Sequence, residues 1–307
     1  MFVRLTIVLT LMLAASTCAA RQLYVSNVTG NDRNRGLSAV GGSDGAGPLR
    51  TIRRAVHLSR PGDEIVIDNT GIPYRECITL AGRRGSGTAT WPLIISGNGA
   101  VLDGSVPVPQ GAWEHYQADI FRFTPRRQTY LRLFHKDRPL VEKPVPPGAL
   151  SPPPLEPLQW CLLNSQVYFR VEPSTLPDSY QLTQTGHAAG LTLYAAHDVD
   201  IRDLVIQGYQ LDGVTVHDLV ERAVLSGLTC RGNGRSGISV GGASRVVIDQ
   251  CLLGDNGRGQ LRVEAPAAVE VSASDVLDSG VPRFLLQGGR LLVDGKPFRN
   301  DELPHSE

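Results

Sequence analysis

The sequence has 307 residues, of which 41% are hydrophobic and 20% are charged, which is the composition of a globular protein and excludes a disordered one. Thirty basic and thirty acidic residues cancel, so the charge gives no indication of a nucleic-acid-binding surface, and we expect no nucleic-acid partner. The 33 glycines and 21 prolines indicate many turns and therefore many short strands.

Residues 1–20 have the features of a secretory signal peptide. Arg4 supplies a positive charge, residues 5–15 form an apolar run too short to span a bilayer, and small residues precede the expected cleavage after Ala20. A lipoprotein site at Cys18 is the alternative, which the preceding threonine disfavours. No later segment is apolar enough to cross a membrane. We therefore expect a secreted or periplasmic protein with no membrane partner after the signal is removed.

Residues 21–105 are predicted to form an N-terminal cap and the first strands. Within residues 51–58, Ile52, Ala55 and Val56 lie on one face of a short helix, which Pro61 and Gly62 end. Such a helix can cover the open end of a stack of strands, where backbone groups would otherwise be unpaired. Strands are predicted at 64–67, 78–80, 93–95 and 100–102.

Residues 106–187 follow no repeat. Proline-rich linkers flank short alternating runs at 128–134 and 166–171, so we interpret this segment as a β-rich insertion. It either overhangs a groove or only covers an edge of the strands around it. The polar tail at 295–307 is expected to be loose.

Residues 188–294 contain a repeat. Apolar residues recur in three series at spacings of 23 or 24 residues, and residues two apart in each series point to the same side of a strand. Each repeat is therefore predicted to hold three short strands with an inward apolar face. The series begin Leu191, Val214, Ile238, Leu261, Phe284; Val199, Ala223, Val246, Val269; and Leu204, Leu228, Cys251, Ser274.

The corners between these strands support the same architecture. Asp203 and Gly227 lie in two-residue bends that suit a left-handed backbone conformation, while Asn233 and Asn256 occupy equivalent places in a longer corner. A leucine-rich repeat has a similar period, but no repeat here contains a helical stretch. The sequence predicts an all-β chain, a right-handed parallel β-helix with three short strands per repeat, a capping helix and a β-rich insertion.

The N-terminal segment also carries motifs in a specific order. They are Leu23-Tyr24-Val25-Ser26, Gly30-Asn31-Asp32, Pro48-Leu49-Arg50-Thr51-Ile52, Pro61-Gly62-Asp63, Tyr74-Arg75-Glu76 and Leu93-Ile94-Ile95-Ser96-Gly97. In this order they resemble the opening of bacterial secreted proteins of the pectin-lyase-like superfamily, the right-handed β-helix repeat proteins. The resemblance covers residues 22–104 by these motifs and 190–286 by the repeat. It implies the fold and an anionic-polysaccharide partner.

The resemblance also implies where a site would lie. In this superfamily sites typically lie on the outer face of the first strand and on the corner before it. A uronate lyase must neutralise a carboxylate, abstract the neighbouring proton and protonate the leaving oxygen, and the resemblance implies an arginine base, often assisted by calcium. The residues predicted for catalysis are Arg262, His217, Arg235 and Glu264. Those predicted for substrate binding are Asp212, Arg258, Thr215 and Ser239.

Structural interpretations compete with each of these roles. Arg262 and Glu264 can form a solvated ion pair, His217 can belong to a turn, and Arg235 and Arg258 can lie in solvent. A hydrolase would need two carboxylates, for which Asp212 and Glu264 are the nearest candidates.

Asp198, Asp200 and Asp203 are candidate calcium ligands that can equally be solvating residues. The sequence lacks the aspartate pairs and Gly-His-Gly motif of polygalacturonase-like hydrolases and a pectate-lyase signature. Two hypotheses follow: a lyase-type enzyme acting on an anionic polysaccharide, and a non-catalytic glycan-binding or structural surface protein.

Overall fold

The computed structural model describes residues 20–42 and 44–299. Residues 1–19, and with them almost all of the predicted signal peptide, lie outside the described residues, as do residues 300–307 of the tail. Within the described ranges, no helix has both the length and the apolar character needed to cross a membrane.

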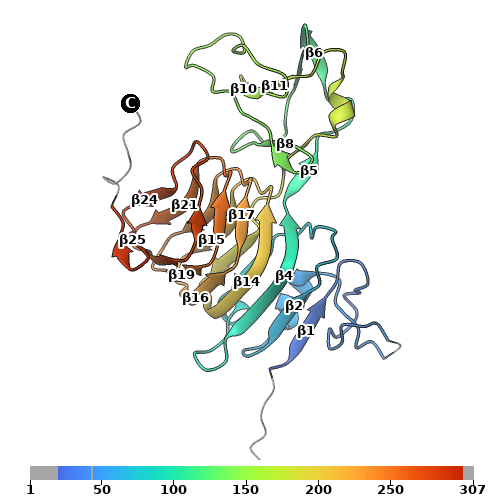
Figure 1. Ribbon diagram of the computed structural model, residues 1–307. Helices are drawn as coiled ribbons and strands as arrows, with labels where there is room; N and C mark the ends of the chain where they lie inside the picture. Colours follow the sequence, from blue (N-terminus) through green and yellow to red (C-terminus); the bar gives the residue numbers. More distant parts are fainter. Residues whose placement is uncertain (1–19, 43, 300–307) are drawn as a thin grey trace, which may run out of the picture.

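The chain is mostly β-structure organised around two parallel sheets (Figure 1). Sheet A is parallel except for its last pair of strands. It is formed by β1 (Gln22–Val25), β2 (Glu64–Ile67), β4 (Leu93–Asp103), β14 (His197–Gln207), β16 (Glu221–Ser226), β17 (Thr229–Arg231), β19 (Arg245–Asp249), β20 (Leu252–Gly254), β22 (Ala268–Ser272), β23 (Asp275–Val276), β25 (Arg290–Val293) and β26 (Lys296–Pro297). Sheet B is formed by β3 (Ile78–Ala81), β13 (Leu191–Tyr194), β15 (Asp212–His217), β18 (Ser236–Val240), β21 (Gly259–Glu264) and β24 (Phe284–Gln287).

The strand register follows the predicted spacing. Val214 pairs with Leu191 on one side and with Ile238 on the other, and Ile238 pairs in turn with Leu261. The second series pairs in the same way along sheet A. The prediction that successive repeats stack in register is therefore confirmed.

One predicted break between strands is absent. The second and third strands of a repeat run on as one element in β14, with a register shift against β4 between Arg202 and Leu204. Asp203 at this point has φ = 55°, and Gly227 at the equivalent bend has φ = 60°. The bends therefore have the left-handed backbone expected from their residues, but in β14 the strand continues through the bend.

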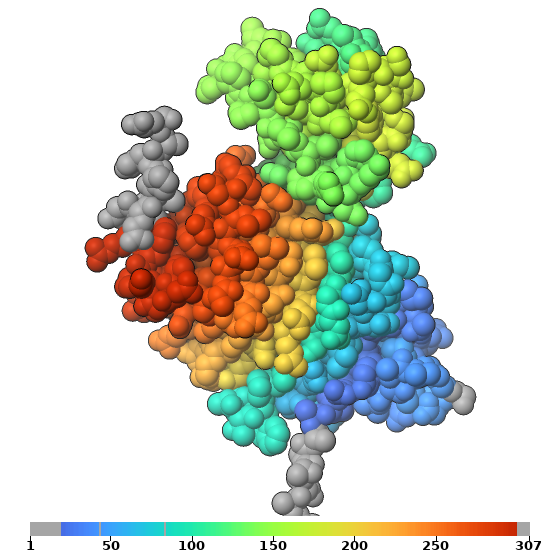
Figure 2. Space-filling model, in the orientation of Figure 1, coloured from blue at the N-terminus to red at the C-terminus, as the bar shows by residue number. Residues whose placement is uncertain are grey.

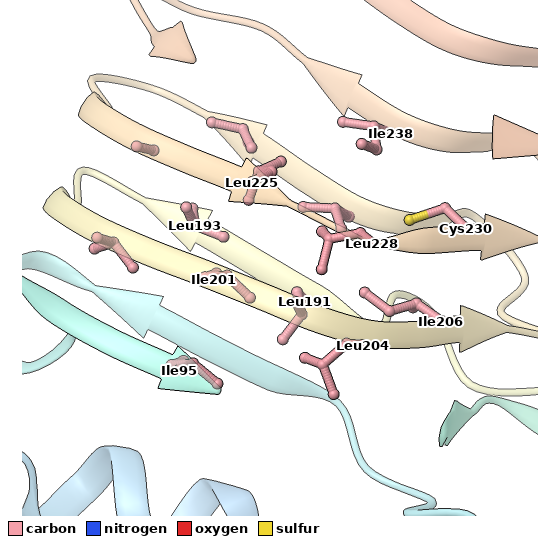
Figure 3. Close-up of a cluster of buried hydrophobic side chains, with 14 of the residues drawn as sticks. Ile95, Leu191, Leu193, Ile201, Leu204, Ile206, Leu225, Leu228, Cys230 and Ile238 are labelled. Atoms are coloured by element: carbon pink, nitrogen blue, oxygen red, sulfur yellow. The ribbon is translucent and has the colours of Figure 1, made fainter. Parts of the chain in front are cut away.

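The inward side chains of both sheets form one apolar core (Figure 3). Leu191 and Leu193 of sheet B face Ile201, Leu204 and Ile206 of sheet A across the interior, and all five are buried. The described cysteines are free, so the repeats are held together by packing and backbone hydrogen bonds, with no disulfide among residues 20–42 and 44–299.

The predicted helix is present as α1 (Ile52–Leu58). The Thr51 side chain caps it by accepting a hydrogen bond from the backbone N–H of Arg54 at 3.2 Å, and Ile52, Ala55 and Val56 are buried. These three residues belong to the same core cluster as the inward faces of the sheets. The helix therefore extends the core at the N-terminal end of the stack.

The long corner contains a ladder of buried asparagines. Asn233 Nδ2 donates to Asn256 Oδ1 at 3.1 Å and to the Ile206 carbonyl at 3.2 Å, while Asn233 Oδ1 accepts from the Tyr209 backbone N–H. Asn256 continues the ladder to the Gln260 side chain at 2.7 Å. Because these asparagines are fully buried, their amides replace water as partners of the corner backbone.

Strands between residues 105 and 185 form two small antiparallel sheets, as predicted for a β-rich insertion. One contains β6 (Glu114–Gln117), β7 (Ile120–Phe123), β10 (Trp160–Leu163) and β11 (Gln166–Arg170), and the other β5 (Ser105–Pro107), β8 (Leu133–His135), β9 (Arg138–Pro139) and β12 (Thr183–Thr185). Figure 2 shows these residues as a lobe beyond one edge of the parallel stack. Part of the run at 128–134 is irregular, since only its last residues join β8.

We expect the substitution Asn233→Ala to lower the free energy of unfolding by about 2–4 kcal/mol, because it removes the side-chain partner of the Tyr209 N–H, the Ile206 carbonyl and the buried Asn256 amide. Urea denaturation followed by circular dichroism measures the change. Asn69→Ala in an exposed turn is the matched control and should change stability by about 0.5 kcal/mol or less. Equal effects of the two substitutions would contradict the role of the ladder.

Candidate functional site

The outer face of sheet B carries a row of polar side chains. Thr192, Thr215, Ser239 and Arg262 follow one another in register on β13, β15, β18 and β21. Adjacent parallel strands lie about 4.8 Å apart, so the row is a ladder of polar groups at that spacing. Three of the sequence-predicted residues therefore lie side by side, although Ser239 is almost fully covered.

A second row runs beside the first. Tyr194 and His217 are neighbours in register, with ring centroids 4.9 Å apart in an edge-to-face contact, and both side chains are exposed. The next position is Gly241, whose N–H donates to the Val216 carbonyl, and Glu264 follows one strand further on. His217 and Glu264 are thus two strands apart, as predicted, and the Glu264 side chain lies over the glycine between them, since a Cβ added at Gly241 would be 3.3 Å from Glu264 Oε2.

Arg262 and Glu264 contact each other on β21. Arg262 Nε lies 2.6 Å from Glu264 Oε1, and the two side chains are 21% and 40% exposed. The ion pair that competes with a catalytic role is therefore present. An arginine with its own carboxylate stays charged, which suits it to binding an anion and not to accepting a proton.

Asp212 requires a correction, because it does not face a substrate. It is fully buried, with one carboxylate oxygen 2.9 Å from Arg235 Nε and the other 3.0 Å from the Thr215 hydroxyl. The hydrogen bond that Arg235 donates to Asp212 raises the pKa of Arg235, so this guanidinium is held as a cation. Asp212 therefore positions Arg235 and Thr215 and has no free oxygen surface for a sugar.

Arg235 and Arg258 are equivalent in the repeat but differ in surroundings. The backbones pair, since Arg258 N donates to the Arg235 carbonyl at 2.8 Å. The Arg235 side chain turns to Asp212, whereas the exposed Arg258 lies near Glu142 and Arg132 of the insertion and influences the pKa of both. The two arginine side chains therefore do not form one row, and the interpretation that they lie in solvent holds for Arg258 but not for Arg235.

The insertion contacts the long corner between the two sheets. A Cβ added at Gly234 would lie 2.0 Å from the Tyr130 carbonyl oxygen, and one at Gly232 would lie 3.1 Å from the Phe134 ring. Gln210 reinforces the contact by donating to the Thr129 carbonyl at 2.9 Å. Glycines at this corner are therefore required for the close approach of the insertion, which covers the corner before sheet B.

A cleft of about 660 Å³ lies between the insertion and the outward side of sheet A. Arg132, Phe134 and Glu142 line it from the insertion, and Arg231 and Asp255 line it from the repeats. Sequence patterns could not predict this cleft, because the residues that line it from the insertion belong to a segment without a repeat. Adjacent arginine, carboxylate and aromatic residues at 131–142 were the available signal, but no spacing connected them with residues 231 and 255.

Of the aspartates considered for calcium, Asp198 is engaged by other side chains, whereas Asp200 Oδ1 is buried and has no hydrogen-bond partner in the described part of the chain. Asp198 is bound by Arg222 Nη2 at 2.9 Å and by His197 Nδ1 at 3.0 Å, and these contacts lower its pKa to about 2, with the Arg222 hydrogen bond as the main cause. Burial raises the pKa of Asp200. Among residues 20–42 and 44–299, no group of three or more His, Cys, Asp or Glu side chains is arranged to hold a metal ion.

Neither protein-family profiles nor curated proteins match this sequence. Among solved structures, the complex of XylC with xylose matches at 10% identity and a TM-score of 0.41, covering 89% of this chain and 69% of the other. A GH136 lacto-N-biosidase from Eubacterium ramulus matches at 11% identity and 0.36, covering 88% of this chain and 51% of the enzyme. A further glycoside hydrolase matches at 10% identity and 0.38, covering 90% and 97%. Likenesses this weak carry no argument about substrate or activity.

We expect Asp198 to stabilise the protein most above pH 4. Its folded-state pKa of about 2 lies below the ordinary value of 3.8, so its contribution is complete above 3.8 and is lost as the pH falls through 2. Urea unfolding of the protein and of Asp198→Asn at pH 7, 3 and 2 measures this. The difference in unfolding free energy should shrink towards pH 2, and a difference independent of pH would contradict the assignment.

Proposed function

We propose that this protein is an exported right-handed parallel β-helix protein of the pectin-lyase-like type that acts on an anionic polysaccharide. The alternation of the chain supports the fold: β13, β15, β18, β21 and β24 of sheet B alternate in sequence with strands of sheet A. Connections between parallel strands of this kind are almost always right-handed. The signal-peptide features of the sequence support export.

The observation that carries the proposed function is the pair of polar rows on the outer face of sheet B. Tyr194, which is 45% exposed, offers a ring face on which a sugar can stack, and Arg262 offers a guanidinium to a sugar carboxylate. The rows run along the stack, so an extended polymer would pass both rows at the spacing of the strands. A chain molecule fits this face better than a compact ligand.

For a lyase, the proposed roles differ among the candidates. His217 is the exposed titratable group beside Tyr194 and is proposed to transfer the proton. Arg262 neutralises the substrate carboxylate, with Glu264 orienting it. Arg235, held as a cation by Asp212, contributes positive charge and is not assigned as the base. Calcium remains a proposed additional counter-ion for the substrate.

The second candidate function is glycan binding without catalysis. The pairing of Arg235 with Asp212 and of Arg262 with Glu264 favours it, because both arginines are committed as cations. In that case the same face binds an acidic polymer, and His217 contributes a hydrogen bond in place of a proton transfer.

We expect purified mature protein to produce an ultraviolet absorbance rise with one of pectate, alginate or a uronate-containing glycosaminoglycan, in the presence or absence of calcium. The new absorbance reports a double bond conjugated to a carboxylate. His217→Ala should lower kcat by about 100-fold or more, because it removes the proton-transfer group. Arg262→Ala should chiefly raise KM by weakening the contact with the substrate carboxylate.

His57→Ala and Arg33→Ala change exposed side chains that belong to neither polar row, so they are the matched controls and should leave turnover unchanged. Binding of a polymer without any absorbance rise would reject the lyase and support the second candidate. Unchanged turnover in both His217→Ala and Arg262→Ala would reject this face as the site. Absence of both binding and turnover would reject the proposed function.

A further inference from the structure

The cleft between the insertion and sheet A contains an arginine without a counter-ion. Within the described ranges, no hydrogen bond or ion pair engages the Arg132 guanidinium, and its Nε is buried without a partner. Burial lowers the pKa of Arg132 from its ordinary value, as the main cause. A desolvated cation that lacks a partner is costly, so a site that keeps one is suited to an incoming anion.

The position of Arg132 is fixed by the structure around it. Its backbone N–H donates to the Thr185 hydroxyl at 3.2 Å, and its carbonyl accepts from the Thr185 N–H at 3.1 Å. Its stem lies against the long corner, since a Cβ added at Gly257 would lie 3.4 Å from Arg132 Cδ. The backbone and the stem of Arg132 are therefore placed at the cleft by the insertion and the repeats, which restricts where the guanidinium can lie.

The acidic groups around the cleft are not bonded to Arg132. Glu142 lines the same cleft and its charge acts on Arg132, but no hydrogen bond or ion pair joins the two side chains among the described residues. Asp255 acts on Arg132 only through its negative charge at a distance, which raises the pKa of Arg132, and the positive charge of Arg258 lowers that pKa. The cation at Arg132 therefore stays available to a ligand.

The rest of the cleft has one apolar wall, formed by Phe134, Pro139 and Leu140. On the side of sheet A, Asp103 is bound by the Ser105 N–H and by Arg75, and Gln207 accepts from Arg231, so these side chains already have partners. A cleft of about 660 Å³ is within the range of about 300–1,000 Å³ for small-molecule sites. A ligand with one carboxylate and an apolar ring face would match Arg132 and the apolar wall.

We propose that this cleft is a second carbohydrate-binding site, separate from the face of sheet B, in which Arg132 binds the carboxylate of an acidic sugar unit. The ligand class rests on the proposed function, whereas the site rests on Arg132 and the cleft alone. Its size suits one or two sugar units, so the cleft would hold the end of a chain or a released fragment, while the open face of sheet B suits the extended polymer.

Isothermal titration calorimetry with galacturonic, glucuronic and mannuronic acid tests the proposal. We expect one of them to bind, and its neutral counterpart (galactose, glucose or mannose) and inorganic sulfate to bind at least tenfold more weakly. Arg132→Met should weaken binding of the acid tenfold or more. Glu142→Gln should bind equally or more tightly, because it removes a competing carboxylate.

Arg33→Met, an exposed arginine in the N-terminal segment, is the matched control and should bind as the unsubstituted protein does. Thermal unfolding separates binding from a structural role: Arg132→Met should melt at the same or a higher temperature, because it removes an unpaired desolvated charge. No binding of any of the three acids, equal binding of sulfate, or unchanged affinity in Arg132→Met would each overturn the proposal.

The polymer assay keeps the two proposals distinct. His217→Ala should retain binding of the acidic monosaccharide, and Arg132→Met should retain binding of the polymer on sheet B. Binding of the monosaccharide, with neither binding nor turnover of any polymer, would reject the proposed function and leave the cleft site in place. Loss of monosaccharide binding in His217→Ala would overturn the separation of the two sites.

Discussion

In-register hydrogen bonding between parallel strands is the constraint on which the rest of this structure depends. A single repeat exposes both edges of its strands and cannot bury its inward side chains, so each repeat requires a neighbour of the same length. The spacing of 23 or 24 residues meets that requirement along sheets A and B. The corners also stack in register, because the buried Asn233 and Asn256 supply the hydrogen bonds that the corner backbone would otherwise lack.

The same regularity determines what the surface can offer. Outward residues on sheet B form rows in which the side chain changes from strand to strand while its position stays fixed, so the proposed polymer-binding face would need no loop. Its charges are largely neutralised from within, by Asp212 under Arg235 and by Glu264 beside Arg262. An unneutralised charge occurs instead where the repeat is interrupted, at Arg132 in the insertion. The regular surface of sheet B therefore presents charges that are already paired, whereas the irregular insertion presents an unpaired one.

The sequence predicted what depends on the period and missed what does not. The pairing of Val214 with Ile238 follows from spacing alone, and the helix over Ile52–Leu58 follows from its apolar face. Asp212 was predicted to bind substrate from the corner before the strand, but the Arg235 side chain and the Thr215 hydroxyl enclose it, and spacing carries no information about that. Arg132 and Asp255 line the same cleft although more than a hundred residues separate them and they share no repeat, so only the folded chain reveals the cleft.

The insertion leaves and rejoins the stack at almost the same point. Ser105 at its start pairs with Thr185 at its end, and the Gly104 carbonyl accepts from the N–H groups of Gly186 and His187. The two ends of the excursion are already joined by hydrogen bonds, so the entropy of closing it depends only weakly on how many residues lie between them. This corner is therefore a natural grafting point, at which lobes of different length and chemistry can be exchanged while the stack beneath keeps its fold.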